Sequence, residues 1–83
     1  MKDSSWRAVK TRGSNHYKKD PTKVEPIDLY RDGGMLRDFC LSNIIKYAYR
    51  NRADTGKPLL MQDLEKIKHY ADILIADQGG EVT

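Results

Sequence analysis

The chain has 83 residues, enough for one small domain, and its formal net charge is +3 at pH 7. Because 39% of the residues are hydrophobic and 33% are charged, the core must be small, and we expect a homo-oligomer. No apolar run approaches the roughly 18 residues of a membrane span. The N-terminus lacks the apolar segment of a secretory signal, so we expect a cytoplasmic protein that does not bind membranes.

Basic residues are concentrated near the N-terminus. Residues 1–23 contain seven lysines and arginines against two aspartates, and the remainder of the chain is mildly acidic. Residues 1–13 are rich in serine, glycine and charge, with Trp6 and Val9 as large apolar residues, and this composition predicts a flexible basic arm. Such an arm could bind nucleic acid or an acidic protein surface, or it could be a solvated tail.

One helical domain is expected after this arm, over residues 14–78, with a flexible tail over residues 79–83. Pro26 can begin a short helix that continues to about Tyr30, because proline is well suited to the first helical position. The two glycines that follow break the chain.

Two long helices are predicted next, the first from about Met35 to Arg52 and the last from about Leu60 to Asp77. The loop between them contains Gly56 and Pro58, which favour a turn. Because such a short loop makes neighbouring helices antiparallel, the predicted fold class is all-α, with two long antiparallel helices, one short helix and a basic N-terminal arm.

Each long helix carries apolar residues at helical spacing, and we expect these two stripes to face each other. On the first helix the apolar arc consists of Cys40, Leu41, Ile44, Ile45 and Ala48. On the last helix the stripe consists of Leu60, Leu64, Ile67, Ala71 and Leu74.

A polar stripe lies beside the apolar arc of the first long helix. Offsets of 3, 4 and 7 place Asn43, Lys46, Tyr47 and Arg50 on one face. Amide, ammonium, phenol and guanidinium groups together suit an anionic partner such as phosphate. In an antiparallel pair, a second set on the last helix would border the same groove: Asp63, Lys66 and Tyr70.

Each of these residues also has a purely structural interpretation. Lys46 and Arg50 could form a solvated basic face paired with Asp63, and Asn43 could bridge two helices. The tyrosines could stack on a base, although amphipathic tyrosines more often complete the edge of a core.

Other kinds of site have weak support in the sequence. The lone Cys40 is best interpreted as a buried apolar residue, and the cysteine and the two histidines lack metal-ligand spacing. A Walker A motif is absent, because the lysine of the loop lacks the preceding glycine and strand. The sequence alone assigns no catalytic residue.

One set of motifs resembles a known family. These motifs are His16-Tyr17, Pro26-Ile27-Asp28, Cys40-x-x-Asn43-x-Ile45-Lys46-Tyr47-x-x-Arg50, a loop that carries Lys57, and Asp63-Leu64-x-Lys66-x-x-x-Tyr70. In this order they resemble the SaV-like family of short bacteriophage proteins, a helical domain of unknown function. They are also similar to the C-terminal part of a nucleotide kinase of short-tailed coliphages that has no Walker-type P-loop.

This resemblance implies a phage protein in the cytoplasm of its host that binds nucleotide phosphate in a helical groove. It further suggests a nucleotide-kinase activity, in which magnesium would bind with the nucleotide. The implied site contains His16, Tyr17, Asn43, Lys46, Tyr47, Arg50, Lys57, Asp63, Lys66 and Tyr70. Asp63 would orient the basic pair or bind magnesium. The first alternative is a non-enzymatic protein that binds and modulates a host protein. The second is weak nucleic-acid binding through the basic arm.

Overall fold

The computed structural model of the chain describes residues 6–10 and 24–80, and throughout these ranges the regular structure is helical. The predicted all-α fold class is therefore confirmed. Residues 6–10 form a helical segment, followed by α2 (Pro26–Asp32), α3 (Leu36–Arg50), the 3₁₀ turn η1 (Ala53–Thr55) and α4 (Met61–Asp77).

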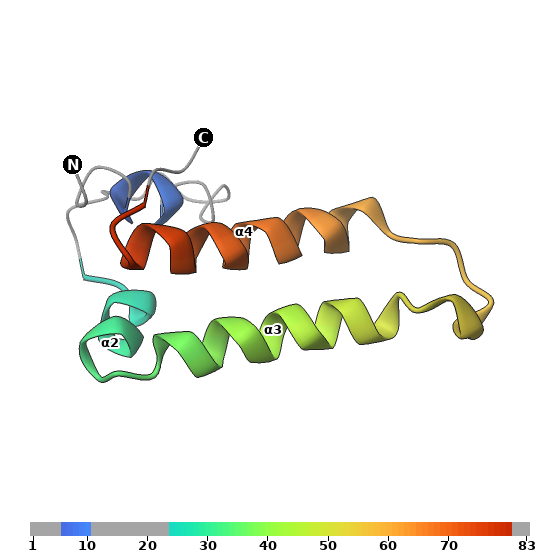
Figure 1. Ribbon diagram of the computed structural model, residues 1–83, viewed down its shortest axis with the longest axis horizontal. Helices are drawn as coiled ribbons and strands as arrows, with labels where there is room; N and C mark the ends of the chain where they lie inside the picture. Colours follow the sequence, from blue (N-terminus) through green and yellow to red (C-terminus); the bar gives the residue numbers. More distant parts are fainter. Residues whose placement is uncertain (1–5, 11–23, 81–83) are drawn as a thin grey trace.

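The two long helices, α3 and α4, form a hairpin. They lie side by side and run in opposite directions, and η1 lies in the loop that joins them (Figure 1). The short helix α2 lies at the open end of the hairpin, where α3 begins and α4 ends. Residues 6–10 lie at this end too, next to the last turns of α4 (Figure 1).

Local signals in the sequence explain where the helices begin and end. Pro26 occupies the first turn of α2, and the side chains of Glu25 and Asp28 form a capping box around it. At the other end, Gly34 has φ of 76°, which lets the Met35 N–H donate to the Tyr30 carbonyl at 2.8 Å. This Schellman arrangement ends α2 and turns the chain into α3.

The same arrangement ends α4. Gly79 has φ of 86°, and the Gly80 N–H donates to the Ile75 carbonyl at 2.9 Å. The first two residues of the predicted flexible tail, 79–83, therefore complete the helix end, while residues 81–83 lie outside the described residues.

The hydrophobic core lies at the open end of the hairpin. Its buried members are Trp6, Val9, Leu36, Cys40, Ile73 and Ala76. Partly buried residues that pack against them are Ile27, Tyr30, Phe39, Tyr70 and Leu74. The core thus draws on every helix of the described chain, including the segment before residue 11.

Residues 6–10 differ from the expectation of a flexible arm over residues 1–13. Asp28 holds this segment with both carboxylate oxygens: Trp6 Nε1–H donates to Oδ1 at 2.9 Å and Lys10 Nζ donates to Oδ2 at 2.7 Å. The guanidinium of Arg31 lies 4.2 Å from the centre of the Trp6 ring. Apolar burial and a paired lysine therefore fix these residues to the domain, and the rest of the predicted arm lies outside the described residues.

The long helices also present different faces to each other from those predicted. On α3 the buried residues are Leu36, Cys40 and Tyr47, so the predicted arc contributes Cys40 but not Leu41 or Ile45, which are exposed. The buried face of α3 therefore includes Tyr47 of the predicted polar stripe.

The buried face of α4 is likewise rotated away from the predicted stripe. Its fully buried residues are Asp63, Ile73 and Ala76. Of the predicted stripe, Leu60 is exposed, whereas Leu64, Ile67, Ala71 and Leu74 are partly buried and Leu74 packs against the core. This orientation brings Asp63 within hydrogen-bonding distance of the end of α3.

Candidate functional site

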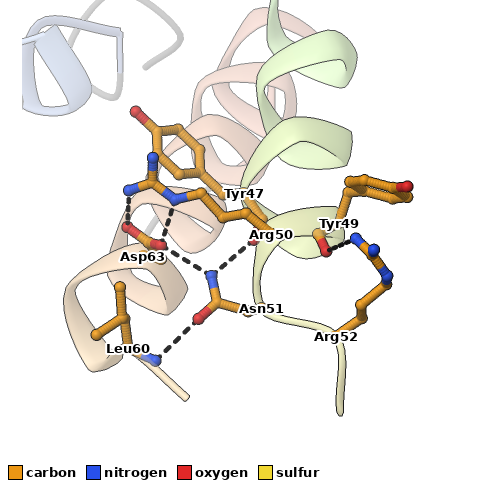
Figure 2. A network of polar contacts seen from close by, with 7 residues as sticks. All are labelled: Tyr47, Tyr49, Arg50, Asn51, Arg52, Leu60 and Asp63. Atoms are coloured by element: carbon orange, nitrogen blue, oxygen red, sulfur yellow. Dashed lines mark hydrogen bonds and ion pairs between the residues drawn. The ribbon is translucent and has the colours of Figure 1, made fainter. Parts of the chain in front are cut away.

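The loop end of the hairpin is fastened by a bidentate ion pair between the last residue of α3 and the first turn of α4. Arg50 Nε donates to Asp63 Oδ2 at 2.7 Å, and Arg50 Nη2 donates to Asp63 Oδ1 at 2.8 Å (Figure 2). Two parallel hydrogen bonds fix the plane of the guanidinium as well as its position. The structure therefore brings together two of the residues that the sequence proposed for the site.

Asn51 completes this network, and the sequence analysis did not include it. Its Nδ2 donates to Asp63 Oδ2 and to the Tyr47 carbonyl, both at 2.8 Å, and its Oδ1 accepts the Leu60 N–H at 2.9 Å (Figure 2). One side chain thus links the end of α3 to the start of α4. The available signal was an asparagine in the last turn of the predicted helix, since asparagine near a helix end favours side-chain to backbone bonds.

Asp63 is saturated by these contacts. Its side chain has no solvent-exposed surface, and its oxygens accept three hydrogen bonds from Arg50 and Asn51. These bonds, those of Arg50 first, lower the pKa of the carboxyl group to about 2. Of the predicted basic pair, Asp63 contacts Arg50 and has no described hydrogen bond or ion pair with Lys46. Magnesium would have to displace these donors to reach it.

Three cationic side chains surround the ring of Tyr47. The distances to the ring centre are 4.7 Å for Lys46 Nζ, 4.9 Å for Arg50 Cζ and 5.1 Å for Lys66 Nζ. Cations are attracted to the negative face of an aromatic ring at such distances. We call Lys46, Arg50 and Lys66 the cationic cluster.

Tyr47 supports this cluster and is not an open platform for a base. The residue is buried, and the ring of Tyr70 stacks on it with centres 6.4 Å apart. Tyr70 in turn packs edge-on against Phe39, with ring centres 5.8 Å apart. The interpretation of these two tyrosines as the edge of a core thus agrees with the structure better than base stacking does.

The cluster carries more positive than negative charge. Asp63 neutralises one of its three cations, while Lys46 and Lys66 are exposed and form no hydrogen bond or ion pair with any described residue. The third guanidinium nitrogen of Arg50, Nη1, points away from Asp63 (Figure 2). An anion could approach this edge of the guanidinium without breaking the pair with Asp63.

Two predicted site residues lie apart from this arrangement, and two cannot be placed. Asn43 Nδ2 donates to the Phe39 carbonyl of its own helix at 2.8 Å, so its amide neither bridges to α4 nor orients the cluster. Lys57 is exposed in the loop after η1, and no described contact joins its side chain to the cluster. His16 and Tyr17 lie outside the described residues.

Cys40 has no part in this site. Burial, with a smaller contribution from the charge of Asp77, raises the pKa of its thiol to about 11. A thiol that remains protonated at neutral pH is a poor nucleophile, in agreement with its interpretation as a core residue.

Together these observations define a small all-α protein in which a helical hairpin carries a preorganised cationic cluster. The chain belongs to the DUF3310 family, described as proteins of unknown function, whose model matches residues 11–72. No curated protein and no solved structure matches the chain. In the described part of the chain, no helix combines the length and apolar character needed to cross a membrane.

Proposed function

We propose that the hairpin binds the phosphate of a nucleotide at the cationic cluster. The observation that carries this proposal is the gathering of Lys46, Arg50 and Lys66 around one tyrosine ring, with one carboxylate to balance them. Like charges repel, so holding three cations together has a cost that a bound dianion or trianion would relieve. The arrangement is therefore better matched to an anionic ligand than to bulk water.

The three cations of the cluster would contact a phosphate in two different ways. Arg50 is held in a fixed plane by Asp63, and one Nη1–H together with the remaining Nη2–H could donate two parallel hydrogen bonds to phosphate oxygens. Lys46 and Lys66 would act as mobile point charges on either side. Because Asp63, itself bonded by Asn51, already holds the guanidinium, binding would require little further ordering of this side chain.

Recognition in this proposal rests on phosphate more than on the base. Tyr47 is covered by Tyr70 and by the cations, so base stacking on it is not part of the proposal. Phosphoryl transfer between nucleotides is a further step, drawn from the resemblance to SaV-like phage proteins and the coliphage kinase. It would need magnesium supplied with the nucleotide, and charge neutralisation by the cluster would be its main contribution.

Thermal stability with and without ligand tests the proposal. A ligand at 100 times its dissociation constant stabilises the folded state by about 2.7 kcal/mol, which for a chain of this size raises Tm by roughly 10–20 °C. We expect such a shift, of a size set by the affinity, with millimolar deoxynucleoside mono- or triphosphates. Inorganic phosphate and magnesium alone serve as separate arms, because they distinguish phosphate recognition from nucleotide recognition.

The Lys46→Ala/Lys66→Ala double variant should lose most of this shift and keep its helical content, since both side chains are exposed. The matched control is Lys68→Ala, another exposed lysine of α4, which pairs with Glu65 outside the cluster. Absence of a shift in the unmodified chain, or an equal shift in the double variant, would contradict the proposal.

A further inference from the structure

The outer face of α3 is a continuous apolar stripe. Leu41, Ile45 and Tyr49 follow one another at intervals of four residues, and their exposed fractions are 43%, 66% and 63%. At 100° per residue they lie within about 40° of one line, on the side of α3 opposite its buried residues. Figure 2 shows the arrangement at one end, where Tyr49 lies on the far side of α3 from Asp63. We call Leu41, Ile45 and Tyr49 the outer stripe.

Charges of opposite sign end this stripe. Asp38 lies one turn before Leu41. Arg52 lies just beyond the end of α3, with its guanidinium 3.8 Å from the centre of the Tyr49 ring and its Nε 2.7 Å from Asp54 Oδ1. Asp38 forms no ion pair within the described residues. Both residues are seven positions from Ile45 in the sequence, and the stripe therefore has the Asp38 carboxylate near one end and the Arg52 guanidinium near the other.

We propose that the outer stripe is the interface of a two-fold dimer, in which the α3 helices of two copies of this chain pack antiparallel with Ile45 at the axis. A two-fold axis brings each residue before Ile45 opposite the residue equally far after it on the other copy. Leu41 then contacts Tyr49 of the second copy, and Asp38 meets Arg52. In this register the stripe pairs apolar side chains with apolar side chains, and the exposed Asp38 carboxylate with the Arg52 guanidinium.

The spacing of the stripe also matches the geometry of a helix pair. Within α3, Asp38, Leu41, Ile45 and Ala48 recur at intervals of 3, 4 and 3 residues, the period of coiled-coil contacts. The two residues that flank the axis at an offset of three, Ser42 and Ala48, are small, so the helices can approach closely. A parallel pair would instead place like charges opposite each other, which is unfavourable.

The interface is independent of the cationic cluster, because the cluster lies on the edge of α3 that faces α4. Each dimer would therefore carry two clusters on its outer sides. Pairing one helix from each copy gives an interface at the lower end of the usual size range, so we expect the dimer to dissociate on dilution.

Sedimentation equilibrium of the full chain from about 1 to 500 μM tests the proposal. The unmodified chain should change from monomer to dimer across this range, whereas Ile45→Glu should remain monomeric, because it places two carboxylates at the axis. We expect its dissociation constant to rise about a hundredfold or more. The matched control is Met61→Glu, an exposed apolar residue of α4 outside the stripe, which should dimerise normally. Circular dichroism verifies that both variants fold.

Charge reversal tests the antiparallel register. Asp38→Arg should weaken the dimer, and so should Arg52→Glu, which also breaks the pair with Asp54. The double variant should restore the dimer, because the two reversed charges again meet as opposite pairs. A monomer at all concentrations would overturn the proposal, and so would a dimer that survives Ile45→Glu. If the double variant fails to restore the dimer, the register is wrong.

Discussion

Asn51 joins the two long helices with a side chain that carries no charge. It donates to Asp63 and to the end of α3 while it accepts the Leu60 N–H, so three polar groups near the loop are satisfied together. A buried carboxylate would be costly if it lacked such donors. Asn51 therefore contributes to stability directly and, through Asp63, to the position of Arg50.

Replacing Asn51 with alanine should destabilise the protein by about 1–2 kcal/mol, because three hydrogen bonds are lost. Asp63 Oδ2 then keeps only the hydrogen bond from Arg50. For a domain of this size each kcal/mol corresponds to about 4–8 °C in Tm, measured by thermal denaturation followed at 222 nm. Asn51→Asp provides a comparison, since it can still accept the Leu60 N–H but repels Asp63. A Tm equal to that of the unmodified chain would show that the network is not stabilising.

At the scale of the elements, two carboxylates fasten the helices at opposite ends of the hairpin. Asp63 joins α3 to α4 at the loop, and Asp28 joins α2 to residues 6–10 at the open end. Burial alone would raise the pKa of Asp28, but the hydrogen bonds from Lys10, Trp6 and the Glu25 N–H outweigh it and lower the pKa. Both carboxylates are thus held in the ionised form by the fold.

This arrangement predicts the dependence of stability on pH. The pKa of Asp63 is about 2 in the folded chain against 3.8 for an ordinary aspartate, so the unfolded state binds the proton more readily. Its contribution is therefore complete above about pH 4 and is lost as the pH falls from about 4 to 2. Urea denaturation between pH 7 and pH 2 measures this loss.

In Asp63→Asn, the fall in unfolding free energy between pH 4 and pH 2 should be smaller than in the unmodified chain. The reason is that this variant lacks one of the carboxyl groups whose pKa the fold lowers. Asp54→Asn is the control, since its carboxylate is 74% exposed and should leave the profile nearly unchanged. Parallel profiles for Asp63→Asn and the unmodified chain would contradict the prediction.

The segment over residues 6–10 should be needed for the stability of the open end. Trp6 is buried against the core and donates to Asp28, so Trp6→Ala should lower the free energy of unfolding by about 3–5 kcal/mol. Chemical denaturation followed by circular dichroism measures this, since the chain has one tryptophan and the variant lacks its fluorescence. Trp6→Phe should cost less, because it retains a ring but removes the Nε1–H donor. If Trp6→Ala is as stable as the unmodified chain, this segment is not part of the folded unit.

The elements themselves could be predicted well from the sequence, and their orientations could not. Proline and glycine positions gave α2 and α4 within two residues at each end, because these signals act locally. The facing sides of α3 and α4 could not be predicted, because hydrophobicity favoured Leu41 and Ile45 as core residues. The actual orientation depends on how Asp63 is satisfied, and this involves residues on two different helices.

At the scale of the whole molecule, the candidate site could likewise be predicted only where its residues share one helix, and not where it depends on contacts between helices. The stripe of Lys46, Tyr47 and Arg50 could be found because helical spacing places these residues together. The role of Asn51 and the covering of Tyr47 by Tyr70 could not, since both depend on the separation and rotation of the packed helices. The N-terminal segment was interpreted as an arm because its composition is polar, whereas two apolar residues and one paired lysine are enough to seat it in the core.

The position of the Arg50 and Asn51 network along the chain has a consequence for folding kinetics. Its partners are separated by 12 and 13 residues, so closing this loop costs little chain entropy. The open end depends on more distant partners, such as Arg31 and Asp77, which are 46 residues apart. Because contacts between distant residues form more slowly, we expect the hairpin to close from its loop toward its open end, and the core to be completed last.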